Sequence, residues 1–350
     1  MEEFQIFSSP KQLYKQMLSD IADAKHTILL ETYIYDNDKI GKKFRNLLVK
    51  KARQGIKVFL LIDAWGSKAD KLFFNNLEKA GGKVKFFREF RYVLRIFSKN
   101  HERNHRKLLV IDGKISYIGS ANITASCLNW RELSIRLEGD ISERFVESFV
   151  NNWEISGKLS RRKISLLLHK GFEIIQDHPG DKIRNLEKRL VNLINSSKKE
   201  ILIETPYFAP SLKIIRALSR AVKRKVNVKI ILPYISDVRV ADILRNIYLG
   251  RLYRNGIKIF YYKPRVLHSK LLIVDNSFFV LGSSNLDYRS FIHQYEINLL
   301  GKDNPLINAL KSYFRETLRN SVCFNYKEWK SRSSLIKIFE LILNKFRHYL

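Results

Sequence analysis

The chain has 350 residues and is 45% hydrophobic, so it is long enough for two domains that each bury a core. Its 64 lysines and arginines against 34 aspartates and glutamates give a formal net charge of +30, which predicts a polyanionic partner, either an anionic membrane surface or a nucleic acid. Cys127 and Cys323 fit neither a disulfide framework nor a zinc site, and no apolar run of about 18 residues is present to span a membrane.

The first half alternates helical and strand-like hydrophobic patterns. After an opening segment at 4–10, we predict a helix from residue 11, a strand at 27–35, a helix ending at 53, a strand at 57–62, a helix before Gly81 and a strand at 84–87. The second half opens in the same style at 172–179 and repeats this order, with helices at 182–195, 211–224 and 237–254 and strands at 200–205, 227–232 and 257–261. The alternation predicts a mixed, largely parallel sheet covered on both faces.

Segment 88–99 makes the first half longer than the second just before the first motif described below. Arg88, Arg91, Arg95 and Lys99 recur at helical spacing, and the aromatic and aliphatic residues between them fall on another face. This pattern is typical of an interfacial helix that places cations on lipid headgroups and its apolar face against acyl chains. An amphipathic helix packed on the core would show the same pattern.

A polar motif occurs once in each half. It begins with His105 in the first copy and with His268 in the second, and each copy runs through a buried strand and a tight turn into a second strand. The residues recurring at one constant offset are His105, Lys107, Asp112, Ser120 and Asn122, matched by His268, Lys270, Asp275, Ser283 and Asn285.

Strand geometry assigns faces to these side chains. Alternate residues of a strand share a face, so the histidine and lysine of each copy point the same way, as do the serine and asparagine. Asp112 and Asp275 fall on the opposite parity from their histidines. They are therefore more consistent with a structural or orienting role than with acid or base catalysis.

The doubled pattern His-x-Lys-x4-Asp-x6-Gly-Ser-x-Asn resembles the phospholipase D superfamily, and segments 204–210 and 282–296 are similar to bacterial cardiolipin synthases. The likeness covers nearly the whole chain. It implies two tandem phospholipase D-like α/β/α sandwich domains, related by pseudo-twofold symmetry, with one shared active site. We expect the first domain at 1–156, a linker at 157–171, the second domain at 172–328 and an amphipathic tail at 329–350.

The resemblance also implies the chemistry. One histidine attacks phosphorus to form a phosphohistidine, and the other protonates the departing alcohol and deprotonates the incoming one, without a metal or cofactor. By analogy, His105 is the nucleophile and His268 the acid and base. Lys107, Lys270, Asn122 and Asn285 would hold the phosphoryl oxygens, with Ser120 and Ser283 as further donors. Glu132 and Glu296 match the acidic residues that orient the histidine rings.

Two further groups of residues allow two interpretations each. Tyr33, Tyr35, Tyr207 and Phe208 stand at strand ends, where they could line a headgroup pocket or simply pack. The tail carries an apolar stripe at Leu335, Ile338 or Phe339, Ile342 and Phe346, which could dock on the domain or lie in a membrane interface. At about 15 residues the stripe is too short to cross a bilayer.

The sequence therefore favours a cardiolipin synthase-type phosphatidyltransferase that acts on phosphatidylglycerol. We expect a cytoplasmic protein, peripheral on the inner face of the cell membrane, since the acidic start resembles no export signal and the chain differs from cardiolipin synthases that begin with transmembrane helices. The alternatives are a phospholipid hydrolase, a metal-independent phosphodiesterase or nuclease acting on DNA, and a basic scaffold with an inactive site. Nucleic acid is the less favoured partner because basic residues are interleaved with large aliphatic ones.

Overall fold

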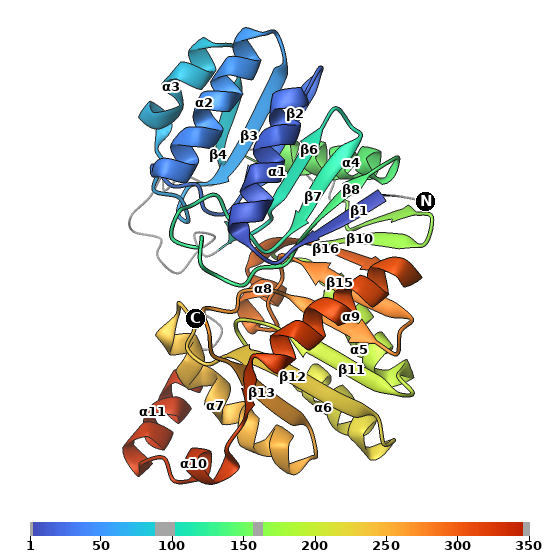
Figure 1. Cartoon of the computed structure of the whole chain (residues 1–350). Coiled ribbons are helices and arrows are strands. Elements are labelled where there is room, and N and C mark those ends of the chain that lie inside the picture. The colour runs from blue at the N-terminus through green and yellow to red at the C-terminus, as the bar shows by residue number, and fades with distance from the viewer. Residues whose placement is uncertain (1–2, 88–101, 157–163, 346–350) are drawn as a thin grey trace.

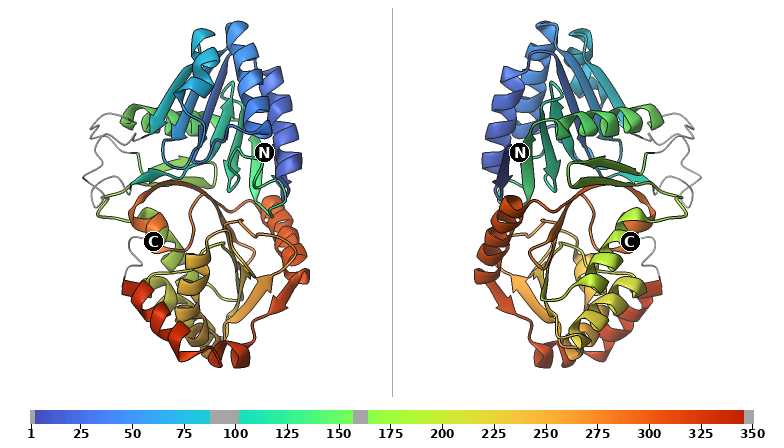
Figure 2. Two further views of the ribbon diagram at one scale, coloured as in Figure 1. Left: turned by 90° about the vertical axis from the view of Figure 1, so that its left-hand side faces the viewer. Right: turned by 90° about the vertical axis from the view of Figure 1, so that its right-hand side faces the viewer.

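The computed structural model describes residues 3–87, 102–156 and 164–345, which form two α/β halves stacked one on the other (Figures 1 and 2). The segment 88–99, for which an interfacial helix is predicted, lies outside the described residues. So do residues 157–163 of the predicted linker and Phe346 of the tail stripe.

The first half holds a sheet in the order β1-β8-β7-β6-β2-β3-β4. Its elements are β1 (Glu3–Phe7), α1 (Pro10–Asp23), β2 (Thr27–Thr32), α2 (Lys39–Arg53), β3 (Lys57–Asp63), α3 (Lys71–Lys79), β4 (Lys83–Phe87), β5 (Arg103–Asn104), β6 (Leu108–Ile111), β7 (Ile115–Gly119), β8 (Ser134–Glu138) and α4 (Ile141–Ile155).

The second half holds a sheet in the order β17-β13-β12-β11-β14-β15-β16-β10-β9. Its elements are β9 (Leu166–His169), β10 (Phe172–Asp177), α5 (Asn185–Ser196), β11 (Glu200–Glu204), α6 (Leu212–Lys223), β12 (Asn227–Pro233), α7 (Arg239–Arg254), β13 (Lys258–Tyr262), β14 (Leu271–Val274), β15 (Phe278–Gly282), α8 (Tyr288–Ile292), β16 (Gln294–Gly301), α9 (Asn304–Arg319), β17 (Ser321–Cys323), α10 (Tyr326–Lys330) and α11 (Ser334–Lys345).

The α/β class and the repeated domain order are as predicted, but the sheets are not largely parallel. Strands β2, β3 and β4 are parallel to one another, whereas β6, β7, β8 and β1 are joined by antiparallel pairs. The second sheet follows the same plan. The motif hairpin is the reason, because a tight turn can join only antiparallel strands. Strand β9 also lies within the predicted linker, where it pairs with β10.

Three hydrophobic clusters hold these layers together. One packs α1, α2 and α3 on the outer face of the first sheet, and another packs α5, α6 and α7 on the outer face of the second. The third is shared by both halves. It combines Val110 and Phe149 of the first half with Ile273 and Leu310 of the second, so α4 and α9 cover the inner faces within one continuous core.

The motif aspartates hold the hairpin turns in place. Asp112 and Asp275 have φ values of 53° and 57°, which suit the left-handed turn between two tightly connected strands. The Asp112 carboxylate accepts the backbone N–H groups of Lys25, His26 and Thr27, each at 2.7 Å. Asp275 accepts three equivalent N–H groups before β11, at 2.6 to 2.9 Å. Each aspartate thus ties its motif turn to the start of the central strand.

Candidate active site

A cavity of about 470 Å³ lies at the junction of the two halves, and both predicted histidines line it. Its polar wall contains the side chains of His105, Asn122, His268 and Asn285. The rest of the lining is largely aromatic and aliphatic, with the polar residues Asp237, Asp287, Arg289 and Gln294 among it. The apolar residues include Tyr33, Trp65, Trp130, Tyr207, Val238, Val240 and Leu244. The site therefore combines polar groups with extensive apolar surface, as expected for an amphipathic substrate.

Short parallel pairings across the junction bring the histidines into position. Strand β5 of the first half pairs with β16 of the second, and the N–H of His105 donates to the carbonyl of Tyr295 at 3.0 Å. Arg131 of the first half forms a bridge with Leu267, and the N–H of His268 donates to the carbonyl of Arg131 at 2.8 Å. In both places the residue that follows the pairing is a glutamate.

Each histidine is consequently held by a glutamate from the other half. Nδ1 of His105 lies 3.1 Å from Oε1 of Glu296, and Nδ1 of His268 lies 2.9 Å from Oε1 of Glu132. A carboxylate at Nδ1 favours the tautomer that carries its proton there, which leaves the lone pair on Nε2. The two halves depend on each other for this arrangement.

The motif serines support the glutamates rather than the substrate. Ser120 donates its hydroxyl to Glu132, and Ser283 donates its hydroxyl to Glu296. The same hydroxyl oxygens accept the N–H groups of Leu133 at 2.9 Å and of Ile297 at 3.0 Å. Both serines are fully buried. This placement differs from the expected role as direct donors to the phosphoryl oxygens, because each hydroxyl proton is already engaged.

Lys107 and Lys270 place two buried ammonium groups beside the histidines. Lys107 donates to the carbonyl of His105 at 2.5 Å, and Lys270 donates to the carbonyl of His268 at 2.8 Å. Neither forms an ion pair with a described carboxylate. Burial, followed by the charge of the other lysine, lowers the pKa of Lys107 to about 7, and burial lowers the pKa of Lys270 to about 8. A phosphate anion would supply the missing negative charge.

The two glutamates differ in their electrostatics. Burial raises the pKa of Glu296 to about 7 despite the nearby Lys107. Burial also acts to raise the pKa of Glu132, but the charge and hydrogen bond of His268 hold it below its ordinary value. The pKa of His105 is lowered well below its ordinary value, first by burial and then by Lys107. The site thus favours a neutral His105 and an ionised Glu132.

The asparagines complete the polar wall. Oδ1 of Asn122 accepts the N–H of Ile34 at 3.2 Å. Asn285 is 3% exposed, and its Oδ1 has no hydrogen-bond partner among the described residues. Both side chains line the cavity, where their amide groups can meet a bound phosphodiester.

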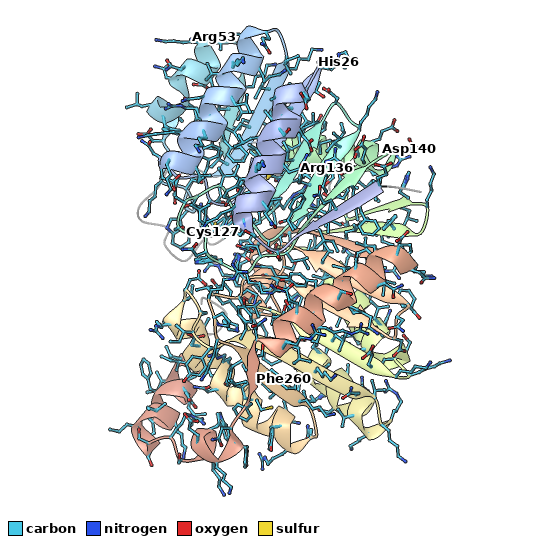
Figure 3. The ribbon with its side chains drawn as sticks, viewed as in Figure 1. His26, Arg53, Cys127, Arg136, Asp140 and Phe260 are labelled. Carbon is cyan, nitrogen blue, oxygen red and sulfur yellow. The ribbon has the colours of Figure 1, made fainter. Side chains whose placement is uncertain are left out.

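Several predicted site residues lie elsewhere. Asp112 and Asp275 anchor the hairpin turns and do not line the cavity, because they stand at the far ends of β6 and β14. Tyr35 is fully buried in the core against Phe74, whereas Tyr33, Tyr207 and Phe208 line the cavity. His26 is exposed and lies at the end of the first half that is remote from the junction (Figure 3).

Of the residues that loops bring to the cavity, sequence analysis proposed Tyr207 but missed Trp130, Asp237 and Asp287. Trp130 packs its ring 5.2 Å from that of His268, and Tyr207 donates to Asp237 at 2.8 Å. Asp287 begins α8 by accepting the N–H of Ser290, and burial raises its pKa to about 6. These loops have no repeating hydrophobic pattern, so the sequence pointed only to aromatic residues at the ends of predicted strands.

Residues 3–87, 102–156 and 164–345 contain neither a cluster of metal ligands nor a helix that could span a membrane. No group of three or more histidine, cysteine, aspartate or glutamate side chains there is arranged to hold a metal ion. Within the same residues, none of the helices combines the length and the apolar character needed to cross a membrane.

Comparison with known proteins places this geometry in a family. The family described as "Cardiolipin synthase, PLD-like domain" matches residues 17–154 and 190–318. The major cardiolipin synthase of Bacillus subtilis (strain 168) is 31% identical over 96% of this chain and 73% of its own length. A cardiolipin synthase of Clostridium perfringens (strain SM101 / Type A) is 30% identical over 97% of this chain and 75% of its own length.

A solved structure has the same fold. The phosphatidylserine synthase of Haemophilus influenzae Rd KW20 superposes with a TM-score of 0.77 over 99% of this chain and 95% of that chain, at 14% identity. The two segments that match the family, 17–154 and 190–318, contain both histidine motifs and both glutamates. The chain therefore belongs to the cardiolipin synthase family of phospholipase D-like phosphatidyltransferases.

Proposed function

We propose that this protein is a cardiolipin synthase that transfers a phosphatidyl group to the hydroxyl of phosphatidylglycerol and releases glycerol. The observation that carries the proposal is the pair of buried lysines beside two histidines, which themselves line a cavity rich in apolar side chains. A phosphodiester anion attached to a lipid tail matches both the charged groups and the apolar side chains. The relatives that match 96% and 97% of this chain are cardiolipin synthases, which supports the same substrate class.

In the first step Nε2 of His105 attacks phosphorus. A P–N bond forms while the bond from phosphorus to the glycerol oxygen breaks, and His268 gives its Nε2 proton to the departing oxygen. Lys107 and Lys270 neutralise the charge on the phosphoryl oxygens, assisted by the amides of Asn122 and Asn285. In the second step His268 takes the proton of an incoming hydroxyl, whose oxygen displaces His105 from phosphorus.

Two asymmetries support these roles. Nε2 of His105 has no hydrogen-bond partner among the described residues, whereas the ammonium of Lys270 lies 3.0 Å from Nε2 of His268. The lone pair of His105 is therefore available for attack. The ionised Glu132 stabilises an imidazolium at His268, which an acid requires. Orientation by the glutamates and the serine hydroxyls would keep both rings in place.

The lipid substrate is favoured over nucleic acid by the aliphatic side chains of the cavity. Val238, Val240 and Leu244 belong to or precede the first turns of α7 and would meet acyl or glyceryl carbon atoms. The aromatic side chains of the cavity could also stack on bases, but a nucleic-acid site would need a continuous basic groove along the backbone, and Arg289 is the one lysine or arginine among the described residues that line this cavity. We further propose that the enzyme works as a peripheral protein at an anionic phospholipid surface, consistent with its net charge of +30.

The test is incubation with phosphatidylglycerol vesicles, followed by chromatography of the lipids and assay of glycerol. We expect cardiolipin and glycerol in equal amounts, and the same yield in excess EDTA because lysines and asparagines supply the charge stabilisation. Phosphatidic acid as the main product would identify a hydrolase. Cleavage of DNA without lipid conversion would identify a nuclease, and activity lost in EDTA but restored by a divalent ion would contradict the mechanism.

The pH profile should report the lysines and His105. Each ammonium is charged only below its pKa, so kcat/KM should fall as pH rises through about 7 to 8, where phosphate binding loses its cations. His105 is neutral above its lowered pKa, so the acid limb should lie below pH 6.5. A bound phosphate raises the lysine pKa values, and kcat should therefore fall at higher pH than kcat/KM. A kcat/KM that stays constant to pH 9 would contradict this assignment.

A further inference from the structure

Helix α11 (Ser334–Lys345) turns its apolar residues away from the protein, the reverse of an ordinary amphipathic helix on a soluble domain. Its one fully buried described side chain is charged, since Glu340 is 4% exposed. Its aliphatic and aromatic residues face outward, and Leu335 and Leu341 are 79% and 62% exposed. A surface helix usually buries the apolar stripe and exposes the charges.

Polar and aromatic contacts, rather than the apolar stripe, hold α11 on the protein. Arg332 donates to both carboxylate oxygens of Glu340 at 2.9 Å, and its guanidinium lies 4.2 Å from the centre of the Trp329 ring. The Trp329 indole donates to the carbonyl of Asn246 at 3.1 Å and covers Gly250, where no side chain could fit. This clamp attaches α10 and α11 to α7 and leaves the stripe uncovered.

The outward residues form one continuous stripe. Leu335, Ile338, Phe339, Leu341 and Ile342, which recur at helical spacing, are between 48% and 79% exposed. Lys337 and Lys345 on the same helix are exposed as well. Large aliphatic residues bordered by lysines are typical of helices that lie in the membrane interface, with cations at the level of anionic headgroups.

The position of α11 relative to the cavity supports a lipid partner. Helices α11 and α7 pack side by side in the lower half of Figure 1. At the start of α7, Val240 and Leu244 line the cavity. Val238, at the mouth, is 42% exposed, and Tyr234 and Ile235 just before it are 47% and 44% exposed. Exposed apolar residues therefore occur both on α11 and at the cavity mouth, and α7 contacts the first and contributes to the second.

We infer that the apolar stripe of α11 is a membrane-docking surface that inserts into a leaflet containing anionic phospholipid and brings the cavity mouth to its lipid substrate. The inference rests on the proposed function for the identity of that substrate, but docking itself does not require turnover. A leaflet accounts for the lysines, the outward aliphatic residues and the neighbouring cavity mouth together. A second copy of this chain, with the same positive charge, would add repulsion between like charges.

The experiment is flotation of the full chain with vesicles of phosphatidylcholine containing phosphatidylglycerol, compared with phosphatidylcholine alone. Leu341→Ser/Ile342→Ser should weaken binding to the anionic vesicles at least about tenfold, through lost apolar insertion. The matched control is Leu166→Ser/Leu168→Ser, which changes leucines that are 39% and 63% exposed on β9. Strand β9 pairs with β10, on the opposite side of Figure 1 from α11, so binding should stay unchanged.

Activity separates this inference from the proposed function. The α11 variant should convert detergent-dispersed phosphatidylglycerol at the wild-type rate and lose activity only on vesicles. If wild-type protein converts no lipid in either form, the proposed function fails, while the flotation result still decides docking. Equal vesicle binding by wild type and the α11 variant would overturn the inference. So would a wild-type dimer in sedimentation that the variant abolishes while vesicle binding persists.

Discussion

His105→Ala should abolish turnover and covalent labelling together, because it removes the nucleophile, with a loss of at least about 10⁴-fold in kcat. His268→Ala should lose about 10² to 10⁴-fold with a lipid substrate, since its alkoxide leaves unprotonated. With an aryl phosphodiester, whose phenolate leaves without a proton, the His268 variant should release one phenolate per site and stall as a phosphoenzyme. Rapid-quench kinetics and acid-labile label on the protein measure both outcomes.

The control for the histidine variants is His26→Ala. His26 is exposed and remote from the junction, so its imidazole should be dispensable for turnover. Label trapped on the His105→Ala protein, with none on the His268→Ala protein, would reverse the two roles. Labelling of both variants would mean that neither histidine is the sole nucleophile.

Each glutamate variant should behave like the variant of the histidine that the glutamate contacts in the opposite half. Replacement of a carboxylate that orients a catalytic histidine by its amide costs about 10⁴-fold in a well-studied triad, and we expect about 10³ to 10⁴-fold here. Glu132→Gln should impair the acid, His268, so an aryl substrate should restore the first step. Glu296→Gln should impair the nucleophile, His105, and an aryl substrate should give little recovery.

Single-turnover rates with lipid and aryl substrates test this crossed pairing. If the glutamates served the histidines of their own halves, the two variants would exchange behaviour. Glu138→Gln is the matched control, because Glu138 also belongs to the β8 region but has a side chain that is 46% exposed and paired with Arg136. Unchanged thermal unfolding of the variants would separate loss of orientation from loss of folding.

Hydrogen bonds from buried arginines across the junction explain why the two halves should act as one unit. Arg106 of the first half binds Glu31 at 3.1 Å and Gln176 of the second half at 2.6 Å. Arg131 donates to Thr317 at 2.8 Å and to the carbonyl of Tyr313 at 3.0 Å. Separation of the halves would break the hydrogen bonds that Arg106 and Arg131 donate to the second half. It would also expose the shared hydrophobic core to water.

The sequence by itself determined the duplication, the α/β class and most of the site's residue types. Hydrophobic periodicity is local, so α2, α6 and strands β3, β11 and β12 appear within a few residues of their predicted bounds. Period-two alternation likewise placed His105 with Lys107 and gave Asp112 the opposite parity, in agreement with its place at the turn.

Only the tertiary structure decided which groups meet. Glu132 and Glu296 exchange histidines because short parallel pairings cross the junction, and alternation along one strand contains no information about the partner strand. The serine hydroxyls turn to these glutamates for the same reason. Periodicity also predicted the stripe of α11 but not its direction, which depends on the clamp between Arg332 and Glu340 and on the packing of Trp329 over Gly250. Such contacts join residues far apart in the chain or set the rotation of a helix, and local pattern determines neither.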